Sequence, residues 1–282
     1  MDLREYAIEN GLSPVGKRPN PFSYLKLFVQ RRGFAFALAR FSLLASTARS
    51  RLGIVWIVLT PTLQVALYGL IFGLVLGDSR PENFVAFLII GVVVFQFISG
   101  SFVDGTKSIT SNASLVRSMD FPRILLPFAT TFSQLGRFLG ILPLALLALI
   151  LIGERPDLDW LGIIPVVLLV LIFSFGLSML SARLTTDFSD LSQLIPFLNR
   201  LLFYSSGVFF SIEKLISAYS FLEFLRWANP ISVYLELARG AVVSGYASTG
   251  IEWLTGALWA FGMLSTGFIF FWLAEEKYGR VN

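Results

Sequence analysis

Two aspartates stand three residues apart in the segment DFSD, at Asp187 and Asp190, and they are the first candidates for chemistry in this 282-residue chain. Three-residue spacing puts both carboxylates on one helix face, where they could bind Mg²⁺ and the diphosphate of a prenyl lipid. An intramembrane enzyme of that kind needs a second acidic cluster facing the same cavity. The apolar segments contain none, so the pattern favours solvated loop carboxylates over a catalytic pair.

The segment GSFVDGTKS, residues 100–108, approaches a phosphate-binding loop without matching it. That loop needs Lys directly after its second Gly and a strand before it, whereas here Thr106 separates Gly105 from Lys107. Cysteine and histidine are both absent, which excludes disulfides, thiol nucleophiles and the usual zinc ligands. We therefore expect no catalytic residue, no metal site and no cofactor on this chain. If ATP and Mg²⁺ are used, another subunit binds them.

The composition predicts an all-α, polytopic membrane protein. Hydrophobic residues make up 55% of the chain and charged residues 14%, and the mean hydropathy is +0.74. A helix needs about 20 apolar residues to cross a bilayer, and its backbone must be satisfied within the segment. Six segments qualify as spans: residues 52–76, 84–103, 124–152, 161–182, 194–210 and 253–273. Together they define a transmembrane domain over residues 51–282.

The basic residues indicate orientation in the membrane rather than nucleic-acid binding, although the net charge is +4. Lys and Arg concentrate on the segments that are cytosolic if both termini are cytosolic. Residues 1–20 are polar, without the apolar core of a signal peptide, and are expected to form a flexible cytosolic tail. Residues 21–50 interleave basic with aromatic residues, which predicts interfacial amphipathic helices.

The cytosolic loop between the second and third spans, TSNASLVRSMDFPRILLP, predicts a short helix over part of residues 110–127. Ser111 or Asn112 could cap its start, and Phe121–Pro122 would end it. The spacing places apolar residues on one face and charged residues on the other: Leu115, Val116 and Met119 against Arg117 and Asp120. An ordinary capped helix on a membrane loop satisfies this spacing equally well.

The same stretch resembles the corresponding loop of bacterial ABC exporter permeases of the polysaccharide and teichoic-acid group. The matching residues are Asn112, Leu115, Val116, Arg117, Phe121, Pro122, Arg123, Leu125 and Pro127. In that family the short helix docks into a cleft of a separate ATPase subunit. The resemblance therefore implies a coupling helix and a set of ATPase-coupling residues: Asn112, Leu115, Val116, Arg117, Met119 and Asp120.

Three further stretches resemble the same family, although Gly207 stands where that family often has Pro. The matches are Arg51, Leu52, Gly53, Trp56 and Pro61; Val208, Phe209, Ser211, Ile212 and Glu213; and Asn229, Pro230, Glu236 and Arg239.

The resemblance implies a homodimeric permease of the cytoplasmic membrane, working with two copies of a separate ABC ATPase. Its implied substrate is a glycopolymer on a polyprenyl diphosphate lipid, such as O-antigen, teichoic acid or cell-wall galactan. A drug or small-lipid permease of the same architecture and a prenyl-lipid enzyme are the alternatives.

Three of the expected spans carry polar or aromatic residues at three- or four-residue spacing, so that each set shares one helix face. Polar side chains inside a membrane face other helices or water rather than lipid. We predict a substrate pathway lined by Gln64, Tyr68, Phe72, Gln134, Arg137, Phe197, Arg200 and Tyr204. Arg200 could attract the diphosphate of the lipid carrier during loading. Hydrogen bonding between helices, without a pathway, remains the alternative for each residue.

The segment between the last two spans is too long for a simple turn. Its pattern sets Ile231, Tyr234, Leu235, Ala238 and Val242 against Glu236 and Arg239. We predict two short helices over residues 213–244 that turn at Asn229–Pro230, enter the outer leaflet as re-entrant helices and narrow the exit. The predicted outer gate comprises Phe209, Asn229, Pro230, Tyr234, Glu236 and Arg239.

Overall fold

The computed structural model describes residues 20–48, 51–53, 55–77, 80–188, 190–212 and 224–278. Every regular element within these ranges is helical, which confirms the all-α prediction. The helices are α2 (Pro21–Gln30), α3 (Arg32–Ala48), α4 (Val55–Val75), α5 (Phe84–Lys107), η2 (Thr110–Asn112), α6 (Ala113–Ser118), α7 (Leu125–Ile152), η3 (Leu158–Gly162), α8 (Ile163–Asp187), α9 (Leu191–Ser205), α11 (Phe224–Ala228), α12 (Pro230–Val242), α13 (Gly250–Leu273) and α14 (Glu275–Tyr278). The predicted tail lies outside the described residues except for Asn20, and residues 213–223 of the predicted outer segment also lie outside them.

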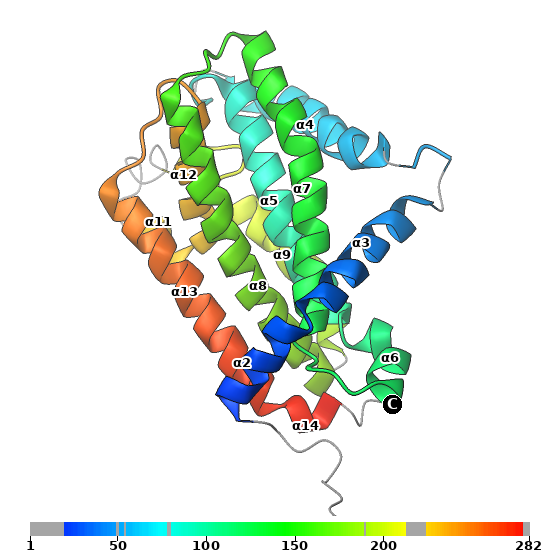
Figure 1. The fold of residues 1–282 in the computed structure, drawn as a ribbon. Helices are drawn as coiled ribbons and strands as arrows, with labels where there is room; N and C mark the ends of the chain where they lie inside the picture. Colours follow the sequence, from blue (N-terminus) through cyan, green and yellow to red (C-terminus); the bar gives the residue numbers. More distant parts are fainter. Residues whose placement is uncertain are drawn as a thin grey trace, which may run out of the picture.

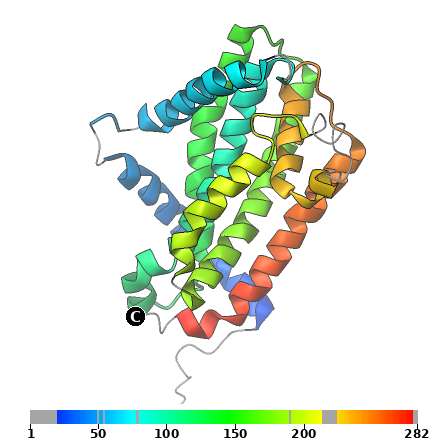
Figure 2. The same ribbon diagram turned by 180° about the vertical axis from the view of Figure 1, so that it is seen from behind.

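Four long helices, α5, α7, α8 and α13, form the body of the molecule (Figures 1 and 2). Helix α8 contacts α5 and α13 along much of its length. Two glycines permit the close approach of α8 and α13, since a Cβ atom on Gly267 would lie 2.2 Å from the Gly176 carbonyl oxygen. Small residues at such crossings let helix backbones pack closely inside a membrane.

Five helices are long and apolar enough to cross a membrane: Val55–Val75, Phe84–Lys107, Leu125–Ile152, Leu158–Asp187 and Gly250–Leu273. They correspond to five of the six predicted spans. The remaining prediction, one continuous helix over residues 194–210, is wrong, because α9 ends at Ser205. Gly207 follows with φ +71°, and a Cβ atom there would lie 2.9 Å from Ile212 Cγ1. This left-handed conformation, which favours glycine, turns the chain after α9.

The aspartate pair is split between two elements. Helix α8 continues to Asp187, beyond the predicted end at residue 182, whereas Asp190 precedes α9. Asp187 forms an ion pair with Arg183 on its own helix and a second one, at 3.7 Å, with Lys277 of α14. The prediction of a loop carboxylate at Asp187 was therefore wrong: its charge is compensated at the end of a helix.

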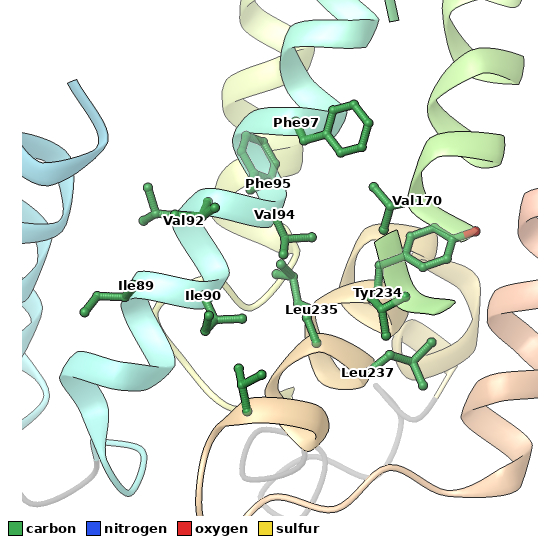
Figure 3. Packing of buried hydrophobic residues seen from close by; sticks show 14 of the residues in the cluster. Ile89, Ile90, Val92, Val94, Phe95, Phe97, Val170, Tyr234, Leu235 and Leu237 are labelled. Atoms are coloured by element: carbon green, nitrogen blue, oxygen red, sulfur yellow. The ribbon is translucent and has the colours of Figure 1, made fainter. Parts of the chain in front are cut away.

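Two apolar cores stabilise the two ends of the bundle. In the first, α12 packs against α5 and α8, where Tyr234, Leu235 and Leu237 meet residues such as Ile90 and Val170 (Figure 3). The second gathers residues of α2, α3, α8, α13 and α14 around Phe121 and Ile124, which follow α6. Helices α2, α6 and α14 consequently share one end of the molecule (Figure 1).

Helix α4 differs from the other candidate spans in its surroundings. It runs obliquely across α5 and α7 (Figures 1 and 2), and only 6% of its most apolar 18-residue window is buried. Its exposed leucines follow one stripe along the helix: Leu63, Leu67, Leu70 and Leu74.

Candidate functional site

The predicted coupling helix exists as α6, but its apolar face is divided. Val116 is buried in the second apolar core, the one around Phe121 and Ile124, with only 4% of its surface exposed, and Leu115 packs partly against the same core. Met119 is 48% exposed and lies beyond the helix in extended conformation. Val116 therefore contributes to this chain's own core, and a partner could reach Met119, Arg117 and Asp120, which are exposed.

The predicted side-chain cap of this helix is wrong. The Asn112 side chain accepts no capping hydrogen bond and instead donates from Nδ2 to the Ser108 carbonyl oxygen at 2.8 Å. Ser111 donates its hydroxyl proton to the Lys107 carbonyl oxygen. Both side chains therefore bond backward to the end of α5 and join it to α6.

The segment that follows α6, residues 119–124, is held by the chain's two terminal regions. Arg31, between α2 and α3, donates a hydrogen bond to the Asp120 carbonyl oxygen, and the Phe34 and Phe121 rings lie 5.4 Å apart. Glu275 of α14 accepts a hydrogen bond from the Arg123 backbone N–H at 3.1 Å. Residues distant in sequence thus fix the connection between α6 and α7.

Glu275 is the centre of this arrangement and is 3% exposed. Its carboxylate also accepts from the Tyr24 hydroxyl at 2.6 Å and pairs with the Arg123 side chain at 3.4 Å. The Tyr24 oxygen in turn accepts from the Ile124 N–H at 3.1 Å. We call Tyr24, Arg123 and Glu275 the inner latch. The sequence prediction missed it, because a charged tail after an apolar span carries no sign of a buried carboxylate.

The inner latch has distinct electrostatics. Burial raises the pKa of the Glu275 carboxyl, although the hydrogen bonds from Tyr24 and Arg123 act in the opposite direction. Burial, and then the charge of Glu275, raise the pKa of the Tyr24 hydroxyl. Tyr24 therefore remains a neutral hydrogen-bond donor at physiological pH.

Three of the predicted pathway residues meet in one polar cavity of about 640 Å³: Gln64 of α4 and Gln134 and Arg137 of α7. Helix α5 completes it with residues that the sequence prediction missed, Gln96 and Asp104. Two side-chain hydrogen bonds cross between helices, from Gln96 Nε2 to Gln64 Oε1 at 2.6 Å and from Gln134 Nε2 to Asp104 Oδ2. The four-residue spacing of Gln96, Gly100 and Asp104 was the available signal, but Asp104 lay just beyond the predicted span.

Three other predicted pathway residues gather around Phe209, which was predicted as part of the outer gate. The Phe72 and Phe209 rings stack at 4.2 Å with planes 3° apart. Tyr68 and Tyr204 flank the same ring, with centroids 6.2 and 5.7 Å from it, and Phe203 lies 5.2 Å from Tyr68. We call Tyr68, Phe72, Phe203, Tyr204 and Phe209 the aromatic cluster. It joins α4 to the end of α9 and the turn beyond.

The last two predicted pathway residues lie on the exposed face of α9. Phe197 is 67% exposed and Arg200 is also exposed. Within a single chain, the structure brings neither of them into the polar cavity or the aromatic cluster. The predicted set thus divides into three groups, of which two are assembled by this chain alone.

The chain turns at Asn229–Pro230, as predicted. Asn229 caps α12 by accepting a hydrogen bond from the Ile231 N–H at 3.1 Å, and Pro230 takes the first helical position. The Asn229 amide also donates to the Ser206 hydroxyl at 3.0 Å. The start of α12 is therefore tied to the turn that follows α9.

Arg239 is the second tie to that turn. Its guanidinium donates to the Gly207 and Val208 carbonyl oxygens, each at 3.0 Å, and to Glu236 Oε1 at 3.0 Å. It also lies 3.3 Å from the centroid of the Phe87 ring on α5. The sequence pattern placed Arg239 on a polar face of α12. That prediction was wrong, since Arg239 is fully buried. A buried arginine is stable here because carbonyls, a carboxylate and an aromatic face receive it.

The remaining predicted gate residues point elsewhere. The Tyr234 hydroxyl donates to the Gly256 carbonyl oxygen at 2.9 Å, which fastens α12 to α13. Glu236 is 29% exposed and lines a second cavity of about 400 Å³ beside α12. Phe209, Asn229 and Arg239 therefore act together at the turn, whereas Tyr234 anchors the opposite side of the helix.

Five candidate spans, three of which line a polar cavity, together with a buried helix at one end, define a polytopic membrane protein. The chain belongs to the ABC-2 type transporter family, which matches residues 35–243.

Several known proteins are similar to this chain in sequence. An O-antigen export system permease of Klebsiella pneumoniae is 28% identical over 206 residues, which cover 72% of this chain and 79% of the relative. A permease of the same description from Myxococcus xanthus is 29% identical over 66% of this chain and 71% of its own length. A polysialic acid transport protein of Escherichia coli is 24% identical over 80% of this chain and 87% of its own length.

Proposed function

We propose that this chain is the membrane-spanning permease subunit of an ATP-driven exporter of a polyprenyl-diphosphate-linked polysaccharide or related cell-envelope glycopolymer. Its family membership over residues 35–243 carries the proposal. The names of its relatives, which export O-antigen or transport polysialic acid, support a polysaccharide substrate. The polar cavity and the aromatic cluster fit such a substrate, because sugars present both hydroxyls and apolar C–H faces.

In the cytoplasmic membrane, the end that holds α2, α6 and α14 faces the cytosol. The excess of Lys and Arg on that side supports this orientation. Helix α9, with the turn after it, completes a sixth crossing, since α9 alone, at 15 residues, is shorter than the bilayer core. Helices α2 and α3 lie at the inner surface, and α11 and α12 form the re-entrant pair at the outer end.

A separate ATPase subunit, present in two copies, supplies the energy, and α6 is its docking element. The exposed Met119 provides an apolar contact, and the neighbouring Arg117 and Asp120 provide a charged rim. Movement of α6 reaches α7 through residues 119–124. The inner latch holds that segment, which makes it a rigid connection.

Two copies of the permease form the complete channel. The exposed leucine stripe of α4 and the exposed apolar residues of α9 supply the faces that the second copy covers. In such a homodimer, Phe197 and Arg200 face the space between the copies. Arg200 then attracts the carrier diphosphate at the inner side, and the turn held by Arg239 limits the outer exit.

A complementation experiment tests this function. In a strain deleted for this chain, glycan should accumulate on its lipid carrier inside the cell, and plasmid-borne wild-type chain should restore surface polymer. Immunoblotting of surface glycan together with extraction of lipid-linked glycan measures both. Normal surface polymer in the deletion strain, with no intracellular accumulation, would rule the function out.

A further inference from the structure

The geometry points to a sugar-binding subsite in the polar cavity between α4, α5 and α7, which holds one uncharged sugar residue of the exported glycan. This inference rests on the proposed function and assigns a ligand class to one part of the pathway. The cavity volume of about 640 Å³ lies within the range of small-molecule sites, roughly 300–1,000 Å³.

The cavity is built with a fixed position for Gln134. This side chain is 6% exposed and packs against Gly100 of α5, where a Cβ atom would stand 2.6 Å from Gln134 Cδ. Its amide nitrogen donates to Asp104 Oδ2. The absence of a Cβ atom at Gly100 thus leaves room for the Gln134 side chain, and Gln134 orients the Asp104 carboxylate. The Asp104 carboxylate is therefore held in a fixed orientation, which lowers the entropic cost of binding a ligand.

Several polar groups in this cavity have bonding capacity left for a ligand. Asn199 Oδ1 is buried and has no hydrogen-bond partner among the described residues. Within the same ranges, Arg137 forms no hydrogen bond or ion pair, and Asp104 receives only the bond from Gln134. A buried acceptor without a donor destabilises the protein, so a ligand hydroxyl that donates to Asn199 Oδ1 would offset that cost.

The charge of the cavity selects an uncharged ligand. Arg137 and Asp104 contribute one charge of each sign, and the other polar lining groups are neutral amides and hydroxyls. A diphosphate would need an excess of cations and would meet the Asp104 carboxylate at close range. A neutral sugar instead gives hydroxyl donors to the carboxylate and amide oxygens and hydroxyl acceptors to Arg137.

A tryptophan ring supplies the apolar contact for the sugar. Trp56 of α4 lines the cavity and is 44% exposed, whereas Phe97 of α5 and Phe138 of α7 are buried and stack on each other with centroids 5.2 Å apart, so they form its apolar wall. A pyranose ring carries C–H groups on its faces, which pack against aromatic rings while the hydroxyls at its edge form hydrogen bonds. The combination of one carboxylate, several amides and one exposed tryptophan ring therefore suits a single sugar residue better than a lipid tail or an anion.

Thiol protection tests the site directly, because the native chain has no cysteine. Ser99→Cys places a single thiol in the cavity, and Ser114→Cys on the exposed face of α6 is the matched control. The full-length permease in lipid nanodiscs is labelled with a small methanethiosulfonate reagent. The neutral probes are the methyl glycosides of galactose, rhamnose and N-acetylglucosamine, and inorganic pyrophosphate is the anionic probe.

We expect at least one methyl glycoside to slow labelling of Cys at position 99, but not at position 114. Asp104→Asn should raise the half-protecting concentration about tenfold, because it removes a charge-assisted hydrogen bond. If Asp104→Asn assembles poorly, Gln134→Glu is made in the Ser99→Cys permease instead. This substitution gives the same test, because it changes the side chain that donates a hydrogen bond to the Asp104 carboxylate. Protection by pyrophosphate alone, or no protection by any glycoside, overturns the inference. A permease that complements export but shows no protection would refute this subsite while leaving the proposed function intact.

Discussion

Helices α4 and α5 are both long and apolar enough to cross a membrane, yet their surroundings are opposite. In α5, 78% of the most apolar 18-residue window is buried within the chain, against 6% in α4. Helix α5 is surrounded by α7, α8 and α12, while α4 contacts the bundle along one side, through residues such as Val65, Tyr68 and Phe72, and exposes its leucines. Hydropathy therefore identifies both as spans without distinguishing an internal scaffold helix from one that must be covered by lipid or by a second copy.

The same division extends to shorter helices. Helix α12 is buried on nearly every side, whereas α9 exposes Leu194, Phe197, Leu201 and Tyr204. The cavity and the aromatic cluster lie where the two kinds of helix meet. We infer that the buried helices position the transport surfaces and that the exposed helices complete them. The predictions that follow test this division in order of decreasing effect.

Removing the Arg239 side chain should have the largest effect on stability. Arg239→Met leaves the Gly207 and Val208 carbonyl oxygens and the Glu236 carboxylate without their donor inside the protein. We expect a loss of about 3–5 kcal/mol in the free energy of unfolding. The control is Arg200→Met on exposed α9, which should change it by less than about 0.5 kcal/mol. Denaturant unfolding in detergent measures both, and equal losses would remove the distinction between α12 and α9.

Glycine substitutions compare α5 and α4 directly. A Cβ atom on Gly91 would lie 2.7 Å from Arg239 Nη2 and 2.9 Å from the Val208 carbonyl oxygen, whereas on Gly69 its nearest neighbour is Leu88 Cδ2 at 3.7 Å. Gly91→Ala should therefore destabilise the protein by about 1–3 kcal/mol through overpacking. Gly69→Ala should be neutral or slightly stabilising, since Ala favours helix. Thermal unfolding of the two purified variants would contradict this account if Gly69→Ala were the more damaging change.

At the end that holds α2, α6 and α14, the surroundings of Val116 and Met119 differ, and so do the effects expected of their substitution. Met119→Asp places a charge on an exposed residue, so the protein should insert normally but bind the ATPase roughly tenfold more weakly and export less. Leu115→Asp should act in the same direction with some loss of stability, because Leu115 is half-buried. Val116→Asp should instead reduce the amount of folded permease. Copurification of the ATPase and substrate-stimulated ATP hydrolysis measure these effects, and unchanged values for Met119→Asp would exclude the docking role.

The inner latch predicts a small pH dependence with a defined sign. Burial raises the pKa of Glu275 above the unfolded-state value of 4.5. Its contribution to stability is therefore fully present below pH 4.5 and is lost as the pH rises through the folded-state pKa. Glu275→Gln cannot ionise, so the wild type should lose stability relative to this variant as the pH rises from 4 to 8. A stability difference that stays constant across this range would show that Glu275 has no shifted pKa.

Much of the fold follows from the sequence because its signals are local. Long apolar runs predicted α7 and α13 closely, and a capping box at Thr249 and Glu252 marks the start of α13 at Gly250. The prediction missed the end of α9 because apolar residues resume at Val208, although Ser205, Ser206 and Gly207 interrupt them and Gly207 adopts φ +71°. A backbone conformation that stops a helix is set by the contacts of the turn with Arg239.

The candidate site was predictable where residues share a helix face and not where partners are distant. Gln64, Gln134 and Arg137 were identified from their spacing and do line one cavity. Arg239 was placed on a polar face because its carbonyl partners lie about thirty positions earlier in the chain. Glu275 was missed for the same reason, since Tyr24 is 251 positions away. Buried charges depend on tertiary partners that a periodic pattern does not contain.

The central claim, that the glycan passes along the side of the molecule where α4 meets α9, has one direct test. Tyr68→Ala combined with Tyr204→Ala removes two members of the aromatic cluster. The control is Phe261→Ala with Phe270→Ala, which truncates two rings on the exposed face of α13. Pulse-labelled surface glycan, measured alongside copurification of the ATPase, should show slow export with intact assembly for the tyrosine pair and normal export for the phenylalanine pair. Wild-type export rates from the tyrosine variant would contradict the account and place the pathway along other faces.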